Sequence, residues 1–343
     1  MVAELFPQDS MFPVGLAKTA SRKHVSAQSD RPRAGSTLKS IDRLAPSSDM
    51  TLIFDRALLA ERRRRVSENT GAHDFLLARV ADDIAERLSI VRRVFPLAAD
   101  IGAHHGLVSR RIREFAGIEN IIDVDSTAVL VAQAPGMRVV AEEDALPFAD
   151  ASLDLVVSGL SLQLVNDLPG ALIQIRRALK PDGLLLAALL GGATLKELRE
   201  SWLAAEAEVS GGASPRVAPF ADVRDMGSLL QRAGFALPVV DSETVSVTYA
   251  DPFALMRELK AMGASNMLIA RRRTPVTRRL LLRAAEVYAE RFAMPDGRVP
   301  ATFEILTLTA WAPDESQPKA LRPGSAQARL ADALGVKEGK LKE

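Results

Sequence analysis

The chain has 343 residues, of which 48% are hydrophobic, and a formal net charge of only +1. This charge gives no electrostatic basis for nucleic acid as a main partner, and the absence of cysteine excludes disulfides, thiolate metal ligands and a cysteine nucleophile. No apolar run approaches the roughly 20 residues that a membrane-spanning helix needs, so no transmembrane segment is expected.

Residues 1–49 show little periodicity and are rich in Ser, Pro, Arg and Ala, which is typical of a disordered leader. The abundance of Arg and Ser leaves an organelle transit peptide open, whereas five acidic residues count against it. The expected location is the cytoplasm of a bacterium, with peripheral association at the inner face of the membrane as an option. If the leader is a transit peptide, the expected location is the mitochondrial matrix instead.

Residues 50–94 are predicted to form an N-terminal helical segment. A helix over 72–90 is favoured because apolar residues recur at spacings of three and four. This apolar face consists of Phe75, Leu76, Val80, Ile84 and Leu88. The run of four arginines at 62–65 lies on a preceding helical stretch and is predicted to be a solvated face.

Short apolar runs then alternate with helical stretches through a predicted core at 95–191. Candidate strands are 95–101, 120–125, 137–141, 153–158 and 183–190, and candidate helices between them are 107–116, 127–134 and 168–179. The turn signal Lys180-Pro181-Asp182-Gly183 precedes the last of these strands. The repeated βα order predicts an α/β fold with a mostly parallel sheet covered by helices on both faces.

The pattern loosens over residues 192–312, which are predicted to hold a substrate or lid region and the last two strands of a seven-stranded sheet. Those strands are expected at 237–248 and 302–311, and the expected helices are 194–209, 222–233, 252–262 and 278–293. The last two helices form an insertion before the final strand. Residues 313–343 are predicted to be a disordered polar tail.

The segment Asp100-Ile101-Gly102-Ala103-His104-His105-Gly106 follows the first core strand. A dinucleotide fingerprint would need glycine at 102, 104 and 107, and only the first is present. The segment instead resembles the D-x-G-x-G-x-G loop of class I S-adenosylmethionine (SAM)-dependent methyltransferases, with His104 in place of the middle glycine. Either His104 is tolerated, or the SAM loop is altered; a third option makes His104 and His105 metal ligands, although no metal is predicted.

The resemblance predicts a Rossmann-like methyltransferase fold and SAM as the cofactor. Gly102 and Gly106 would let the backbone pass close to the ligand, and Asp100 would order the loop or reach the ammonium group through water. Asp125, at the end of the second strand, is expected to bind the ribose hydroxyls. Before Leu146-Pro147-Phe148, in a segment similar to the G-D-A-x-x-L-P-F motif, Glu142 is the expected adenine acid, with Glu143 and Asp144 as alternates. Each acid alone is equally consistent with a helix cap or a solvated charge.

Later motifs make the resemblance more specific. Residues 158–169 are similar to the S-x-L-S-L-x-W-V-N-D-L-P segment of the complex I assembly factor 5 family, with Leu164 where the family often has tryptophan. Further matches lie at 54–56, 191–199, 214–220, 262–266 and 299–303. Membership would imply methylation or arginine hydroxylation of a protein substrate, a subunit of NADH dehydrogenase (complex I). The malonyl-carrier-protein methyltransferases share the core and are a second enzyme alternative.

Three polar residues after the fourth core strand are weak catalytic candidates: Gln163, Asn166 and Asp167. Capping of the next helix explains the last two equally well. If the substrate is an arginine, Asp167, Glu197 and Glu200 are candidates to receive its guanidinium. A non-catalytic assembly chaperone that retains the fold is the alternative outside enzymes.

Overall fold

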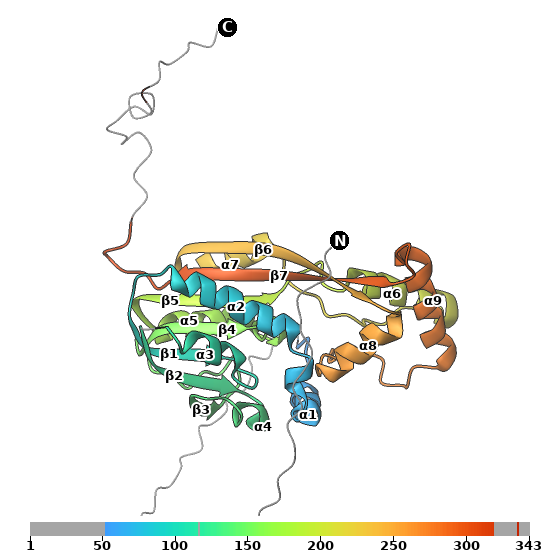
Figure 1. Cartoon of the computed structure of the whole chain (residues 1–343), viewed down its shortest axis with the longest axis horizontal. Coiled ribbons are helices and arrows are strands. Elements are labelled where there is room, and N and C mark those ends of the chain that lie inside the picture. The colour runs from blue at the N-terminus through green and yellow to red at the C-terminus, as the bar shows by residue number, and fades with distance from the viewer. Residues whose placement is uncertain (1–51, 116, 319–334, 336–343) are drawn as a thin grey trace, which may run out of the picture. The chain divides into compact units, whose positions relative to one another are not determined.

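The computed structural model describes residues 52–115, 117–318 and 335. The predicted leader at 1–49 and most of the predicted tail lie outside these residues. The described part is built on one seven-stranded sheet with helices on both faces (Figure 1). This architecture confirms the predicted α/β class and the Rossmann-like arrangement.

The strand order is β3-β2-β1-β4-β5-β7-β6, with β1 to β5 parallel and β7 antiparallel to both of its neighbours. The strands are β1 (Phe95–Ile101), β2 (Ile118–Asp125), β3 (Met137–Val140), β4 (Leu153–Gly159), β5 (Leu179–Leu190), β6 (Ala236–Tyr249) and β7 (Val299–Trp311). The order reverses between β1 and β4. In open parallel sheets such a switch point leaves a ligand crevice beyond the carboxyl ends of the strands.

Two apolar clusters cover the two faces of the sheet. Helices α2 (Phe75–Ser89) and α3 (Leu107–Ile112) contribute to one, whereas α5 (Leu168–Ala178) and α7 (Val223–Arg232) contribute to the other (Figure 1). Strand β4 is buried along almost its whole length, as expected of a strand covered on both sides. The switch point therefore lies over a well-packed core.

Several elements differ in extent from the prediction. Helix α3 ends at Ile112, and α4 covers only Ala128–Val131. The predicted turn at 180–183 is part of β5, but Asp182 has a φ of 59°. The ladder between β4 and β5 is irregular there, because it passes from the pair Leu153–Leu179 to Leu155–Leu184. The strand thus contains the predicted change of direction.

The predicted insertion forms the end of the molecule that carries α6 (Lys196–Ser210), α8 (Pro252–Ala261) and α9 (Arg278–Phe292) (Figure 1). Strand β5 ends at Leu190 opposite Ile305, so residues 299–303 of β7 pair with β6 alone. This two-stranded extension of the sheet leads to the helices, with α6 packed on α9. The prediction of a helical insertion before the last strand is confirmed.

Helix α1 (Arg56–Val66) connects the core to the insertion. On the core side, Asn166 Oδ1 accepts hydrogen bonds from the backbone N–H of Ile53 and Phe54, at 2.9 and 2.8 Å. On the other side, Asp55 N donates to Met267 O at 2.9 Å, and Arg62 Nη1 donates to Ser265 O at 2.6 Å. The helix is therefore fixed from both directions.

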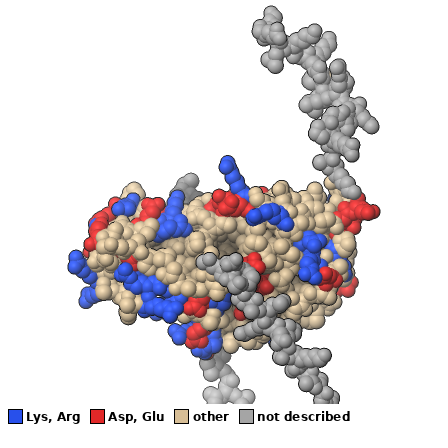
Figure 2. Space-filling view, turned by 180° about the vertical axis from the view of Figure 1, so that it is seen from behind, with Lys and Arg blue, Asp and Glu red and all other residues tan. Residues whose placement is uncertain are grey.

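Two short 3-10 turns, Thr70–Ala72 and Leu162–Leu164, complete the described elements. On the face shown in Figure 2, basic and acidic side chains lie in small groups separated by neutral surface. This mixture agrees with the net charge of +1. Among the described helices, none has the length and apolar character to cross a bilayer.

Candidate functional site

The loop after β1 passes through three left-handed residues. The φ angles of Gly102, His104 and Gly106 are 69°, 51° and 80°. A Cβ at Gly102 would lie 2.1 Å from the Cβ of Ser161, and one at Gly106 would lie 2.6 Å from Pro135 Cδ. The two glycines are thus required both by conformation and by the close approach of neighbouring segments.

His104 adopts the conformation that glycine would have in the related loops. Its Nε2 lies 3.1 Å from the carbonyl oxygen of Gly159, so this nitrogen carries the hydrogen. Burial, with a smaller effect from the charge of Arg63, lowers the pKa of His104 to about 3. The ring is therefore a neutral bridge between the ends of β1 and β4.

This lowered pKa predicts a pH dependence of stability. An unfolded histidine binds a proton near its usual pKa of 6.5, whereas folded His104 does so only near 3. The free energy of unfolding should thus fall as the pH decreases from about 6.5 towards 3, by up to about 1.4 kcal/mol per pH unit. In His104→Gly, which suits the left-handed backbone, this part of the pH dependence should be lost. Urea denaturation of both proteins between pH 4 and 8 measures it; parallel curves would show that folded His104 takes up a proton normally.

Asp125 lies buried at the end of β2, beside this loop. Its Oδ2 accepts from the backbone N–H of His104 at 3.0 Å, and its Oδ1 accepts from that of Thr127 at 2.7 Å. Arg63 Nη1 of α1 lies 3.6 Å from Oδ2. The predicted ribose acid is therefore held by the loop and faces a cation.

The predicted adenine acid, Glu142, and its alternate Glu143 differ in environment; the other alternate, Asp144, follows them in the chain. Glu143 is fully buried, and its Oε1 accepts from Ser161 Oγ. Glu142 is about half exposed. Arg56 of α1 joins them, with hydrogen bonds to both carboxylates and to the carbonyl oxygen of Leu164. The site thus contains Asp125 and Glu143 close together, with arginines from one helix opposite.

Asp100 is in a different position. Its carboxyl is buried within β1, and neither of its oxygens has a hydrogen-bond partner among the described residues. Burial, reinforced by the charges of Asp123 and Asp125, raises the pKa of Asp100 well above its usual range. The group is therefore a poor source of negative charge for a ligand.

A cavity of about 740 Å³ adjoins these residues. Most of its lining is apolar and comes mainly from α1, α2, α6 and α8, including Leu59, Leu77, Leu198, Trp202 and Met256, with Phe303 contributed by β7. Asp74 is the one acidic residue among the residues that line it, and His105 Nε2 lies 3.2 Å from its carboxylate. The volume is in the range that accommodates small-molecule ligands.

Of the catalytic candidates, only Gln163 lines the cavity. Its side chain is buried; Nε2 donates to Leu160 O at 2.8 Å, whereas Oε1 has no partner. Asn166 holds the backbone before α1, and Asp167 caps α5 by accepting from Gly170 N at 2.8 Å. Neither lies at the cavity wall.

The acids considered for a guanidinium substrate also lie elsewhere. Glu197 is buried, with its carboxylate accepting from the backbone N–H and hydroxyl of Thr302. Glu200 and Asp167 do not line the cavity. An arginine side chain entering this cavity would meet Asp74 as its acid.

Two arginines that the sequence does not assign to the candidate site, Arg56 and Arg63, contact its acids. The predicted solvated face holds for Arg64 and Arg65 and is wrong for Arg63, which is 5% exposed. Arg56 and Arg63 are seven residues apart, which places them on one face of a helix. This seven-residue spacing indicates a shared face for Arg56 and Arg63, but the adjacent arginines at 62, 64 and 65 obscure it in the sequence.

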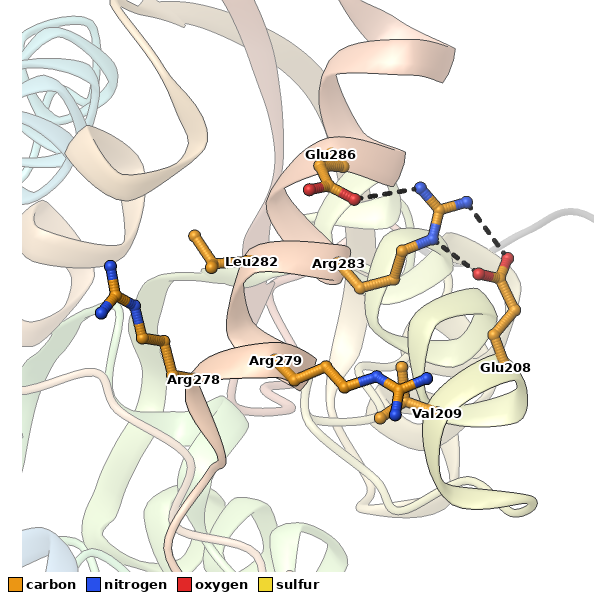
Figure 3. A pocket seen from close by; sticks show the side chains of 7 residues that line it. All are labelled: Glu208, Val209, Arg278, Arg279, Leu282, Arg283 and Glu286. Atoms are coloured by element: carbon orange, nitrogen blue, oxygen red, sulfur yellow. Dashed lines mark hydrogen bonds and ion pairs between the residues drawn. The ribbon is translucent and has the colours of Figure 1, made fainter.

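A second hollow, of about 670 Å³, lies between α6 and α9, away from these residues (Figure 3). There Arg283 forms ion pairs with Glu208, Glu286 and Glu290. These charged groups pair with one another at an exposed surface. Among the described residues, no three His, Cys, Asp or Glu side chains gather so as to hold a metal ion.

The switch-point crevice, the glycine-containing loop and the acid after β2 together define a protein of the class I methyltransferase fold. Residues 99–187 match the family model described as a methyltransferase domain. The chain belongs to the NDUFAF5 family of methyltransferase-fold proteins, as the following relatives show.

The protein called arginine-hydroxylase NDUFAF5, mitochondrial, of Danio rerio is 38% identical over 295 residues, covering 84% of this chain and 91% of the relative. The human protein of that name is 41% identical, and the match covers 80% of this chain and 81% of the human protein. A malonyl-[acyl-carrier protein] O-methyltransferase of Halorhodospira halophila is 39% identical, covering 68% and 79%. Among solved structures, the YcgJ protein of Bacillus subtilis aligns with 69% of this chain and 99% of its own at a TM-score of 0.48 and 14% identity.

Proposed function

We propose that this protein binds SAM in the crevice at the carboxyl ends of β1 and β2 and modifies a side chain of a protein partner. The partner that the family suggests is a subunit of respiratory complex I (NADH dehydrogenase) during assembly. The observation that carries the proposal is the convergence of the buried carboxylates of Asp125 and Glu143 on the loop at 102–106.

The residues present fit SAM in charge and in room. Asp125 is suited to accept hydrogen bonds from the ribose hydroxyls, and Glu142, at the exposed side, from the adenine amino group. The cavity reaches His104 and Arg63, which contact Asp125, whereas Asp125, Glu142 and Glu143 do not themselves line it. Before the acids can bind a ligand, the side chains of Arg56 and Arg63 must give up part of their contact with them.

When bound, SAM supplies an electrophilic methyl group, and the protein's task is to align the acceptor with it. Gln163 is suited to this task because its Oε1 is buried at the cavity wall without a partner. It would accept a hydrogen bond from an N–H or O–H group of the substrate. The neutral ring of His104, in the loop that would hold SAM, would add no positive charge to the site.

A second candidate activity is arginine hydroxylation, which the names of the NDUFAF5 relatives favour. Hydroxylation adds one oxygen to the substrate and requires an oxidant, whereas methylation adds one CH₂. Mass spectrometry of complex I subunits, from cells with and without this protein, distinguishes the two. If complex I subunits show neither mass change, the result favours the assembly chaperone.

Calorimetric titration with SAM and S-adenosylhomocysteine tests the binding site. We expect micromolar binding, and a loss of about a hundredfold or more in Asp125→Asn, because the amide can no longer accept from both ribose hydroxyls. Asp150→Asn, at an exposed carboxylate paired with Arg177, is the matched control and should bind normally.

Equal affinity in Asp125→Asn and the unaltered protein would contradict the role of Asp125. No binding of either ligand to the unaltered protein would remove SAM from the proposal and favour the chaperone.

A further inference from the structure

We propose that Arg63 recognises the carboxylate at the amino-acid end of SAM and so selects ligands that carry this group. The inference rests on the proposed function, since it extends the same site. It starts from the position of Arg63, which is 5% exposed and lines the cavity from α1. Its guanidinium therefore faces the ligand space rather than solvent.

The contacts of Arg63 are incomplete. Its Nη1 lies 3.6 Å from Asp125 Oδ2 and 3.9 Å from Glu143 Oε1, and it has no hydrogen-bond partner. These distances exceed those of N–H···O hydrogen bonds. A guanidinium cannot lose its proton to relieve the mismatch, so Arg63 retains an unused donor in a buried position.

The other arginines of α1 are satisfied. Arg56 donates to two carboxylates and a backbone carbonyl, and Arg62 donates to Ser265 O. Arg64 and Arg65 bind Glu61 at the surface. Within this helix, the spare buried donor belongs to Arg63.

The chemistry of SAM supplies the missing partner. A carboxylate offers two oxygens that match the planar fork of a guanidinium. Of the two carboxylates that face Arg63, Glu143 lies 3.9 Å away and is already bound by Arg56 and Ser161, which leaves Asp125. If Asp125 is engaged by the ribose hydroxyls, a ligand carboxylate becomes the best available acceptor for Arg63.

Ligand truncation separates this role from a general effect on the site. S-adenosylhomocysteine carries the amino-acid end, whereas 5′-methylthioadenosine retains adenine and ribose but lacks it. We expect Arg63→Gln to weaken binding of S-adenosylhomocysteine by tenfold to a hundredfold and to change that of 5′-methylthioadenosine less than threefold. Arg63→Lys keeps the charge without the fork and should show a smaller loss, again confined to S-adenosylhomocysteine. Arg64→Gln, on the exposed side of the same helix, is the control.

Thermal unfolding establishes that each variant is folded; should Arg63→Gln fail, Arg63→Lys alone decides the question. Equal losses for the two ligands, or no loss, would overturn the role of Arg63 while leaving SAM binding in place. If the unaltered protein binds neither ligand, the proposed function itself fails.

Discussion

Replacing Glu206 with glutamine should lower the free energy of unfolding by about 3–5 kcal/mol. Glu206 is fully buried in α6, where it pairs with Arg216 and accepts from the backbone N–H of Ser214. Arg216 is itself largely buried, with its guanidinium 4.7 Å from the ring centre of Trp202. The substitution leaves this cation without its counter-charge inside the protein. Urea denaturation at neutral pH measures the effect.

Glu208→Gln is a close control, because it makes the same change two residues further along the same helix. Glu208 is about half exposed and pairs with Arg283 at the surface (Figure 3), so its loss should cost less than about 1 kcal/mol. The double variant Glu206→Leu with Arg216→Met should recover much of the stability, because it removes both buried charges. Equal effects of Glu206→Gln and Glu208→Gln would show that the Glu206–Arg216 pair is solvated.

The second large effect is expected for Gly102→Ala. The added Cβ would lie 2.1 Å from the Cβ of Ser161, at a residue whose φ is 69°. A left-handed conformation costs alanine about 1–2 kcal/mol, and overpacking adds typically 1–3 kcal/mol. We expect a combined loss of about 2–5 kcal/mol by urea denaturation, together with weaker SAM binding, because the loop must move away from Ser161.

Gly211→Ala separates the two contributions. Gly211 ends α6 with a φ of 65°, but no atom lies within 4 Å of a Cβ added there. It should therefore show the conformational cost alone, about 1–2 kcal/mol. Similar losses at Gly102 and Gly211 would mean that Ser161 moves aside easily.

The sheet could be predicted because its strands are apolar runs separated by clear turn and helix signals. Strand β4 illustrates this, since 153–158 was predicted and Leu153–Gly159 is observed. The short helices were overestimated: α3 ends at Ile112, although the predicted stretch continues to residue 116. Helix ends are set by local hydrogen bonding, which apolar periodicity does not report.

The site was predictable only in part, for a physical reason. The acids follow their strands directly, so topology brings Asp125 to the crevice. Arg63, Ser161 and the cavity wall come from segments distant in sequence, and their contacts depend on packing. In the run 62–65, Leu59 and Val66 lie at helical spacing from Arg63 and indicate its buried face, but four adjacent arginines hide this signal in the sequence.

The position of α1 has a consequence for the order in which ligands act. Its Arg63 faces the acids of the proposed cofactor site, whereas its Leu59 and Val66 form part of the cavity wall. A ligand that shifts this helix at the acids would therefore change the free energy of binding in the cavity, and the reverse also holds. Such coupling is reciprocal: if the cofactor raises the affinity for the protein substrate by some factor, the substrate raises that for the cofactor by the same factor. If the protein binds both ligands as proposed, α1 would make the two binding events a single linked equilibrium.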